Sequence, residues 1–393
     1  MTYDFERLVE RRGTNCEKYD GCFRIFGTEE LLPMWVADMD FETPSFIIEA
    51  MEDRLKHHVL GYSLRPDSYY NAVQGWLARR WQWQVDKQWI EFTPGTVCAV
   101  SLAIQAFTSE GDGVVIQTPV YGPFSWVIEG NGRRVERNRM KYLPDGRAEI
   151  DFDDLEEKLS RSKMFILCNP HNPTGRVFTQ EELTRIAELC EKYDVIVVAD
   201  EIHCDLVQKP YRHIHFASLG EDASHRSVTI ISPAKSFNVA GLSSSVVIVP
   251  DAAMRERFHQ AEEAIHVGQG NIFGTIAIEQ AFTHGDEWVD QLNDYIGGNI
   301  DFILKFLAEK IPSVKCYRPE AMYLIWLDFT EWGMTHKELC DFMLNAARIG
   351  MTEGRFFGVE GEGYMRMNVA APRSVIEQAM NQLYEASLQL KNL

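Results

Sequence analysis

A single lysine, Lys235, stands between an apolar stretch and a run of small residues in SVTIISPAKSFNVAGLSSS, from Ser227 to Ser245. A lysine after a buried strand is in most proteins a solvated loop residue. Its amine can also form an imine with an aldehyde, and Ser232, three residues earlier, offers a hydroxyl to a phosphate. The pattern S-x-x-K also occurs in serine acyl-enzymes, but those need companion S-D-N and K-T-G motifs, which are missing here.

Two further stretches hold polar side chains where apolar strands are expected to end. Asp200 closes VIVVADE, and burying its carboxylate is costly unless it has a partner. It is either the N-cap of a following helix or the partner of a ring nitrogen. NPHNPTGR, residues 169–176, is rich in turn formers, so it is either only a rigid loop or a loop whose asparagine donates to a phenolic oxygen.

Three more motifs suit a phosphate, a planar ring and a carboxylate. TPGTVCAV, residues 93–100, places a Gly-Thr turn before an apolar helix, whose first N–H groups could bind a phosphate. Tyr121 in PVYGPF could lie on a flat ring or pack in the core. Arg366 in YMRMNVAA alternates with apolar residues, so it faces opposite to them on a strand. An inward arginine needs an anion, and a carboxylate fits it bidentately.

These residues need a scaffold, and the chain predicts alternating strands and helices. The clearest helix spans residues 179–194, where Thr179 and Glu182 form a capping box. Short apolar runs predict five strands buried on both faces: residues 113–119, 164–170, 195–201, 228–234 and 244–250. We expect an α/β fold with a mostly parallel sheet between layers of helices, and ligands at the carboxyl ends of its strands.

The pattern of predicted strands and helices changes after about residue 311. Residues 321–329 and 363–371 predict strands of a smaller α+β unit, and residues 374–393 predict a helix that closes it. The stretch PMWVADMDF precedes the large-domain pattern, so the N-terminal segment is expected to join the smaller unit. We predict a large domain over residues 45–285 and a small domain made of residues 1–44 and 286–393.

Composition excludes several kinds of partner. The 393 residues carry a net charge of −19 and offer no basic face, so we expect no nucleic acid and no membrane as a partner. No apolar run approaches the ~20 residues of a membrane span, and the first residues contain no signal peptide. The eight cysteines include no C-x-x-C, which predicts reduced thiols and a cytoplasmic location.

Histidines were considered as metal ligands. His213 and His215 in HIHF lie on one face of a possible strand, as a metal pair would. No nearby acid or cysteine completes the set, and metal sites usually need three or four ligands, so we predict no metal. His203, three residues after Asp200, is a candidate to orient that carboxylate.

The motifs taken together resemble those of fold-type I pyridoxal-phosphate enzymes, the aspartate aminotransferase superfamily. GT at residues 95–96, PVY, NPHNPTG, ADE, SPAKSFNVAG and RMN occur in the family's order, and the resemblance covers nearly the whole chain. WVADMDF, DEIHCDL and AKSFNVAGL are further similar to the PatB/MalY-type cystathionine β-lyases, also called cysteine C–S lyases. The resemblance implies a seven-stranded sheet and pyridoxal 5′-phosphate as the cofactor.

The resemblance also implies roles for single residues around that cofactor. Lys235 would form the Schiff base, Asp200 would contact the pyridine nitrogen, Asn172 would contact the ring hydroxyl and Tyr121 would stack on the ring. His203 would belong to the same set. The phosphate would be held by Gly95, Thr96, Val97 and Ser232.

Substrate and partner contacts follow from the same resemblance. Arg366 and the main-chain N–H of Ala37 would hold the substrate carboxylate, with Asn172 beside them. Tyr62 would reach the cofactor phosphate of the neighbouring subunit in a homodimer. Asn271 is expected to face the neighbour's site.

Departures from the aminotransferase pattern favour the lyase branch. Many aminotransferases carry an arginine eight residues after the lysine, where this chain has Ser243, and a tyrosine three residues after the aspartate, where it has His203. Gly122 follows Tyr121 where some lyases have a second tyrosine, which leaves activation of the leaving group open. We expect β-elimination from cysteine S-conjugates such as L-cystathionine or L-cystine, giving a thiol, pyruvate and ammonia.

The sequence raises three alternative functions. An aminotransferase would use the same residues and pass the amine to a 2-oxo acid. A dinucleotide-binding oxidoreductase would need G-x-G-x-x-G after its first strand, and the sequence has none. A binding protein on an enzyme scaffold stays open because fold does not settle function.

Overall fold

Seven strands form the central sheet of this chain in a computed structural model, which describes residues 2–390. Their order is β2-β10-β9-β8-β7-β3-β4. β10 runs antiparallel to both neighbours, and every other neighbouring pair is parallel. The predicted α/β fold with a mostly parallel sheet is confirmed. The strands are β2 (Ile90–Thr93), β3 (Gly113–Thr118), β4 (Arg134–Arg139), β7 (Met164–Cys168), β8 (Ile196–Asp200), β9 (Ser227–Ile231) and β10 (Ser245–Ile248).

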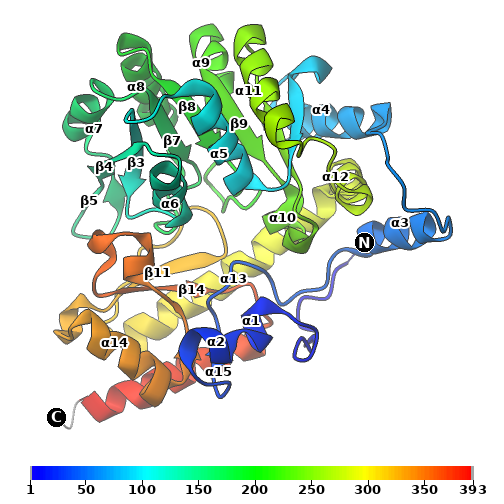
Figure 1. Ribbon diagram of the computed structural model, residues 1–393. Coiled ribbons are helices and arrows are strands. Elements are labelled where there is room, and N and C mark those ends of the chain that lie inside the picture. The colour runs from blue at the N-terminus through cyan, green and yellow to red at the C-terminus, as the bar shows by residue number, and fades with distance from the viewer. Residues whose placement is uncertain (1, 391–393) are drawn as a thin grey trace.

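Helices cover both faces of this sheet (Figure 1). Successive side chains of a strand point to opposite faces of the sheet and pack in different hydrophobic cores. In β8, Val198 packs in the core on one face, whereas Val197 and Ala199 pack in the core on the other face. The first face carries α5 (Thr96–Phe107), α6 (Pro123–Gly130) and α11 (Ala252–Ile265). The second carries α7 (Phe152–Leu159), α8 (Gln180–Lys192), α9 (Glu221–His225), α4 (Asp67–Trp81) and α12 (Ile272–His284). α8 begins with the predicted capping box of Thr179 and Glu182.

A smaller part lies beneath the carboxyl edge of the sheet (Figure 1). Its antiparallel sheet has the order β11-β14-β13. Its strands are β11 (Leu324–Asp328), β13 (Thr352–Glu353) and β14 (Tyr364–Asn368), and its helices are α1 (Glu17–Asp20), α2 (Cys22–Phe26), α14 (His336–Phe342) and α15 (Arg373–Leu390). The other α-helices are α3 (Ser45–Leu55), α10 (Pro233–Ser236) and α13 (Asp286–Lys310), and the short strands β5 (Lys141–Tyr142) and β6 (Ala148–Glu149) pair with each other.

The N-terminal segment pairs with this smaller part. β1 (Leu32–Pro33) lies parallel to β12 (Ile349–Gly350), with Leu32 opposite Ile349. This pairing supports our proposed division into residues 45–285 and residues 1–44 with 286–393. α13, with 25 residues, links the two parts, and no helix within residues 2–390 is long and apolar enough to cross a membrane.

Buried ion pairs fix the N-terminal segment. Lys18 has no exposed surface, and its Nζ donates to Asp40 at 2.7 Å and lies 4.0 Å from Asp38. Arg11 donates to the same two carboxylates, at 2.6 Å to Asp38 and 2.7 Å to Asp40. Each charge is therefore compensated, which a buried charge requires.

The amide of Asn238 ties this segment to the loop after α10. Asn238 accepts from Met39 N and donates to the carbonyls of Met39 and Phe41. Asn238 has a φ of 57°, a left-handed conformation that asparagine tolerates better than most residues. Together the ion pairs and this amide hold residues 36–41 over the carboxyl edge of the large sheet.

We predict that Lys18→Met lowers the free energy of unfolding by about 3 kcal/mol, because it leaves the buried Asp40 carboxylate with Arg11 as its one remaining cation. Urea denaturation measures this loss. The control is Lys56→Met, which breaks an exposed pair with Asp53 and should cost less than about 1 kcal/mol. Equal stability of the Lys18 variant and the parent chain would contradict the role given to this network.

Candidate active site

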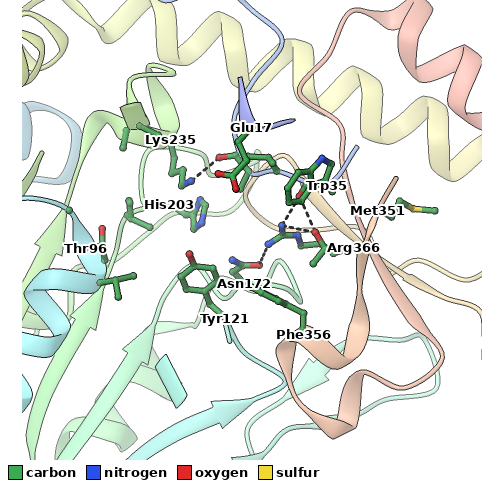
Figure 2. Close-up of a pocket in the computed structure, with 18 of the residues that line it drawn as sticks. Glu17, Trp35, Thr96, Tyr121, Asn172, His203, Lys235, Met351, Phe356 and Arg366 are labelled. Atoms are coloured by element: carbon green, nitrogen blue, oxygen red, sulfur yellow. Dashed lines mark hydrogen bonds between the residues drawn. The ribbon is translucent and has the colours of Figure 1, made fainter. Parts of the chain in front are cut away.

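One cavity of about 840 Å³ lies between the carboxyl edge of the large sheet and the smaller part. Figure 2 shows Lys235, His203, Tyr121 and Asn172 around one central space, with Thr96 on one side and Arg366 on the other. Most of the residues predicted from the sequence line it: Ala37, Gly95, Thr96, Val97, Tyr121, Asn172, Asp200, His203, Lys235 and Arg366. Segments far apart in the chain therefore converge on this cavity.

Lys235 lies in the single turn of α10, which Ser232 caps through Ala234 N. Its Nζ donates to the carbonyl of Ala37 at 2.8 Å. Burial lowers the pKa of Lys235 to about 8, and repulsion from Arg366 acts in the same direction. A fraction of the amine is therefore neutral near neutral pH, as a nucleophile or base must be.

Asp200 is the last residue of β8, between Cys168 and Ile230 in the register. Its side chain is buried and accepts one hydrogen bond, from Ile202 N at 3.1 Å. Burial raises the pKa of Asp200 to about 7. No cation forms an ion pair with it in the described part of the chain, so its carboxylate lacks the partner that would stabilise its charge.

Arg366 lies on β14 and is also buried. Its guanidinium donates to Asn172 Oδ1 at 3.1 Å, to the Trp35 carbonyl at 2.9 Å and to Thr352 Oγ1 at 3.1 Å, and its Nε has no partner. Burial lowers the pKa of Arg366 to about 10. Within residues 2–390 no carboxylate pairs with it, so the cavity offers a fixed cation to a ligand anion.

The N-terminus of α5 forms one end of the cavity. Gly95 caps this helix with a φ of 102°, and a Cβ added there would meet no atom within 4 Å. The first N–H groups of the helix lack intrahelical acceptors, which makes this open end suited to an anion. Ser243 and Ser244 also line the cavity, and our sequence analysis had not assigned them a role in the site.

Neutral groups complete the polar wall. Burial lowers the pKa of His203 to about 3, so the imidazole is neutral at physiological pH. Its Nδ1 is buried without a partner, and no hydrogen bond joins it to Asp200 among the described residues. Burial also raises the pKa of Tyr121, which keeps the phenol protonated. Neither His203 nor Tyr121 therefore carries a charge that would compensate Lys235, Asp200 or Arg366.

Three of the predicted residues do not line the cavity. The Ser232 hydroxyl donates to the Ser244 carbonyl at 2.7 Å and accepts from Ala234 N at 3.1 Å. Tyr62 is 97% exposed, between α3 and α4. Asn271 caps α12 and donates to the Leu242 carbonyl.

The expectation that no acid lies near His213 and His215 was wrong. Glu201, adjacent to Asp200, makes a short hydrogen bond to His215 Nδ1 and lies 3.4 Å from His213 Nε2. Glu201 also accepts from Phe216 N at 2.8 Å. The two histidines lie in a loop and not in a strand, so the sequence distance between residues 201 and 213 concealed the contact.

An apolar wall of the cavity escaped sequence analysis. It is formed by Ile25, Phe26, Trp35, Met343, Leu344, Met351 and Phe356, with Glu17 at its edge. All of these residues belong to the smaller part. Those of the wall come from α2, from the segment after β1 and from the stretch between residues 343 and 356. No periodic pattern marked them, because tertiary packing alone brings them to the site.

Comparison with known proteins gives the family. The sequence profile described as aminotransferase class I and II matches residues 30–383, so this chain belongs to that family. The chain is 42% identical over 385 residues to cystathionine beta-lyase PatB of Bacillus subtilis, covering 98% of this chain and 99% of the relative. It is 32% identical to protein MalY of Escherichia coli, covering 98% of each.

Solved structures give the same result. Cystalysin from Treponema denticola, which contains a pyridoxal 5′-phosphate cofactor, matches with a TM-score of 0.96 and 35% identity over 99% of this chain and 100% of its own. A PLP-bound C–S lyase from Staphylococcus hominis matches with a TM-score of 0.91 and 30% identity, over 98% of both chains. The predicted resemblance to this fold is confirmed.

We predict that Lys235 in the cofactor-free protein titrates near its shifted pKa of about 8 and not near 10.5. Reductive ¹³C-methylation followed by NMR titration measures this, and Lys235→Ala identifies the signal. Arg366→Gln should move the titration to higher pH, because a repelling cation is removed. Titration of Lys235 together with the surface lysines would contradict the described electrostatics.

Proposed function

We propose that this chain is a pyridoxal 5′-phosphate-dependent carbon–sulfur lyase, which cleaves cysteine S-conjugates by β-elimination to a thiol, pyruvate and ammonia. The observation that carries this proposal is the convergence of Lys235, Asp200 and Arg366 around one cavity, where none of the three has an ion-pair partner within residues 2–390. Relatives named cystathionine beta-lyase over nearly the full length support the reaction.

The residues present fit this cofactor. Asp200 would pair with its protonated ring nitrogen, since this buried carboxylate has no ion-pair partner among the described residues and burial raises its pKa. The amide of Asn172 and the ring of Tyr121 would hold the ring hydroxyl and the ring face. The open N-terminus of α5, at Gly95, Thr96 and Val97, would hold the phosphate. Ser232 would support this end indirectly, through its bond to the Ser244 carbonyl.

The chain's own groups would then bind substrate and move its proton. Arg366 would hold the α-carboxylate, exchanging bonds to Asn172 and Trp35 for a bidentate pair. Ala37 would contribute its main-chain N–H at the same place. The amine of Lys235, with its lowered pKa, would take the α-proton. When bound, the cofactor supplies an electron-accepting ring for the electron pair left on Cα.

The shape of the cavity suggests where the sulfur substituent lies. One wall of the cavity is apolar and borders the part lined by Lys235, Asp200 and Arg366. It is formed by Ile25, Phe26, Trp35, Met343, Leu344, Met351 and Phe356. An S-substituent that leaves as a thiol would face this wall, which excludes water from the departing sulfur. Burial raises the pKa of Tyr121, so its phenol would act as a hydrogen-bond donor and not as a base.

An aminotransferase is the second candidate, because the family profile carries that name and the same residues serve both reactions. In the lyase the β-substituent would leave the substrate, whereas in the aminotransferase the proton taken from Cα would be delivered to the cofactor. The position of Ser243, which lines the phosphate end where many aminotransferases have arginine, favours the lyase.

We also propose a homodimer in which Tyr62 reaches the neighbour's site. The segment between α3 and α4 stands at the edge of the molecule (Figure 1). Large apolar side chains are exposed there at Val59, Leu60, Tyr62 and Leu64, and at Leu55 at the end of α3. Exposed apolar clusters of this kind mark protein interfaces. Asn271 would lie near the same interface. The eight unpaired cysteines support our assignment to the cytoplasm, and the net charge of −19 argues against nucleic acid as a partner.

We predict that the purified holoprotein releases pyruvate from L-cystathionine without any added 2-oxo acid. Lys235→Ala should lower the rate by at least about 1,000-fold, because the proton-transfer group is lost. A coupled lactate dehydrogenase assay measures the product. No pyruvate from cystathionine or from a panel of cysteine conjugates would overturn the lyase, and amine transfer to a 2-oxo acid would then support the alternative.

We predict that mixing two inactive variants restores activity through shared sites. Lys235→Ala lacks the amine and Tyr62→Ala lacks the predicted phosphate contact, but a hybrid dimer has one site with both residues intact. Subunit exchange followed by the pyruvate assay should give more activity than the sum of the separate variants. A monomer in sedimentation, or no gain after demonstrated exchange, would contradict the proposed dimer.

A further inference from the structure

Three potential metal ligands meet at the edge of the cavity. His336 and Cys340 are four residues apart on α14 and so share one face of the helix, and Glu353 ends β13 beside them. The Cys340 sulfur lies 3.6 Å from His336 Nε2 and 3.6 Å from Glu353 Oε2, and Nε2 lies 2.9 Å from that same oxygen. Cys340 and Glu353 also line the cavity.

These distances match one face of a zinc tetrahedron. With metal–ligand bonds of ~2.3 Å to sulfur and ~2.1 Å to nitrogen or oxygen, the sulfur lies ~3.6 Å from each other ligand, and nitrogen and oxygen lie ~3.4 Å apart. Only the pair of His336 and Glu353 must separate, by about 0.5 Å, as an ion replaces their hydrogen bond.

The chemistry of the three ligands also suits zinc. A thiolate, an imidazole and one carboxylate suit zinc and not magnesium or calcium, which prefer oxygen ligands. The Glu353 side chain is 54% exposed, so an ion can enter from solvent. The buried Nδ1 of His336 has no partner among the described residues, so nothing prevents the ring proton from residing there while Nε2 binds an ion.

We propose that His336, Cys340 and Glu353 form a zinc-binding site, with its fourth position open toward the cavity. The ion would join α14 to β13 and border the space that the proposed substrate occupies. A reactive-thiol role for Cys340 fits less well, because burial and then Glu353 raise the pKa of the thiol to about 12. A bound dication deprotonates such a thiol outright.

Two other groups of potential ligands are less suitable. Glu201, His213 and His215 are fully buried, and Glu201 is occupied by the His215 ring and by Phe216 N. The third group, Glu91, His259 and Glu262, has no thiol and combines one imidazole with two carboxylates. Both groups nevertheless provide internal controls for a binding experiment.

The test measures metal binding by the holoprotein, not its activity. After equilibrium dialysis against Zn²⁺, we expect one ion per chain, and at least about tenfold weaker binding in both Cys340→Ala and Glu353→Gln. Co²⁺ should give a thiolate-to-cobalt charge-transfer band that Cys340→Ala lacks. Circular dichroism and cofactor absorbance show that each variant is folded and loaded.

Matched controls locate the ion. Cys316→Ala removes another partly exposed thiol that belongs to none of the three groups, and it should bind Zn²⁺ like the parent chain. His213→Gln and His259→Gln should also leave binding unchanged. Unchanged binding in Cys340→Ala, loss of binding in a control variant, or no binding by the parent chain would each overturn the proposal.

Discussion

The site depends on charges that the fold buries without compensating them. A buried charge is ordinarily paired with an opposite charge, as Lys18 is: it is fully buried, and its Nζ donates to the Asp40 carboxylate at 2.7 Å. Asp200, Lys235 and Arg366 have no such partner among the described residues, and their pKa values shift toward the neutral forms. Three buried charges without partners lower the stability of the fold. Their position around one cavity therefore indicates a site for a ligand that carries the opposite charges.

The surrounding structure keeps these charges apart. Asp200 is fixed at the end of β8 and Lys235 follows β9, whereas Arg366 comes from β14 of the smaller part. The buried network of Lys18 and the amide of Asn238 hold residues 36–41 between the two parts, and the Ala37 carbonyl there accepts from Lys235.

Sequence reasoning succeeded where local patterns carry the structure. Five strands were predicted within a few residues because continuous apolar runs mark strands buried on both faces, and polar residues at their ends line the cavity. β4, RVERNR, escaped because it is a charged edge strand without an apolar run. The contact of Glu201 with His213 and the apolar wall were missed because loops and domain packing create them.

The most direct test compares the free energy of unfolding of Asp200→Asn with that of the parent chain at pH 8, without and with pyridoxal 5′-phosphate. Above the raised pKa of about 7, the cofactor-free parent bears the cost of a buried, ionised carboxylate. We therefore expect the cofactor-free variant to be at least as stable as the parent, and the order to reverse when the cofactor is bound. A variant that is less stable by the same amount in both states would contradict the account.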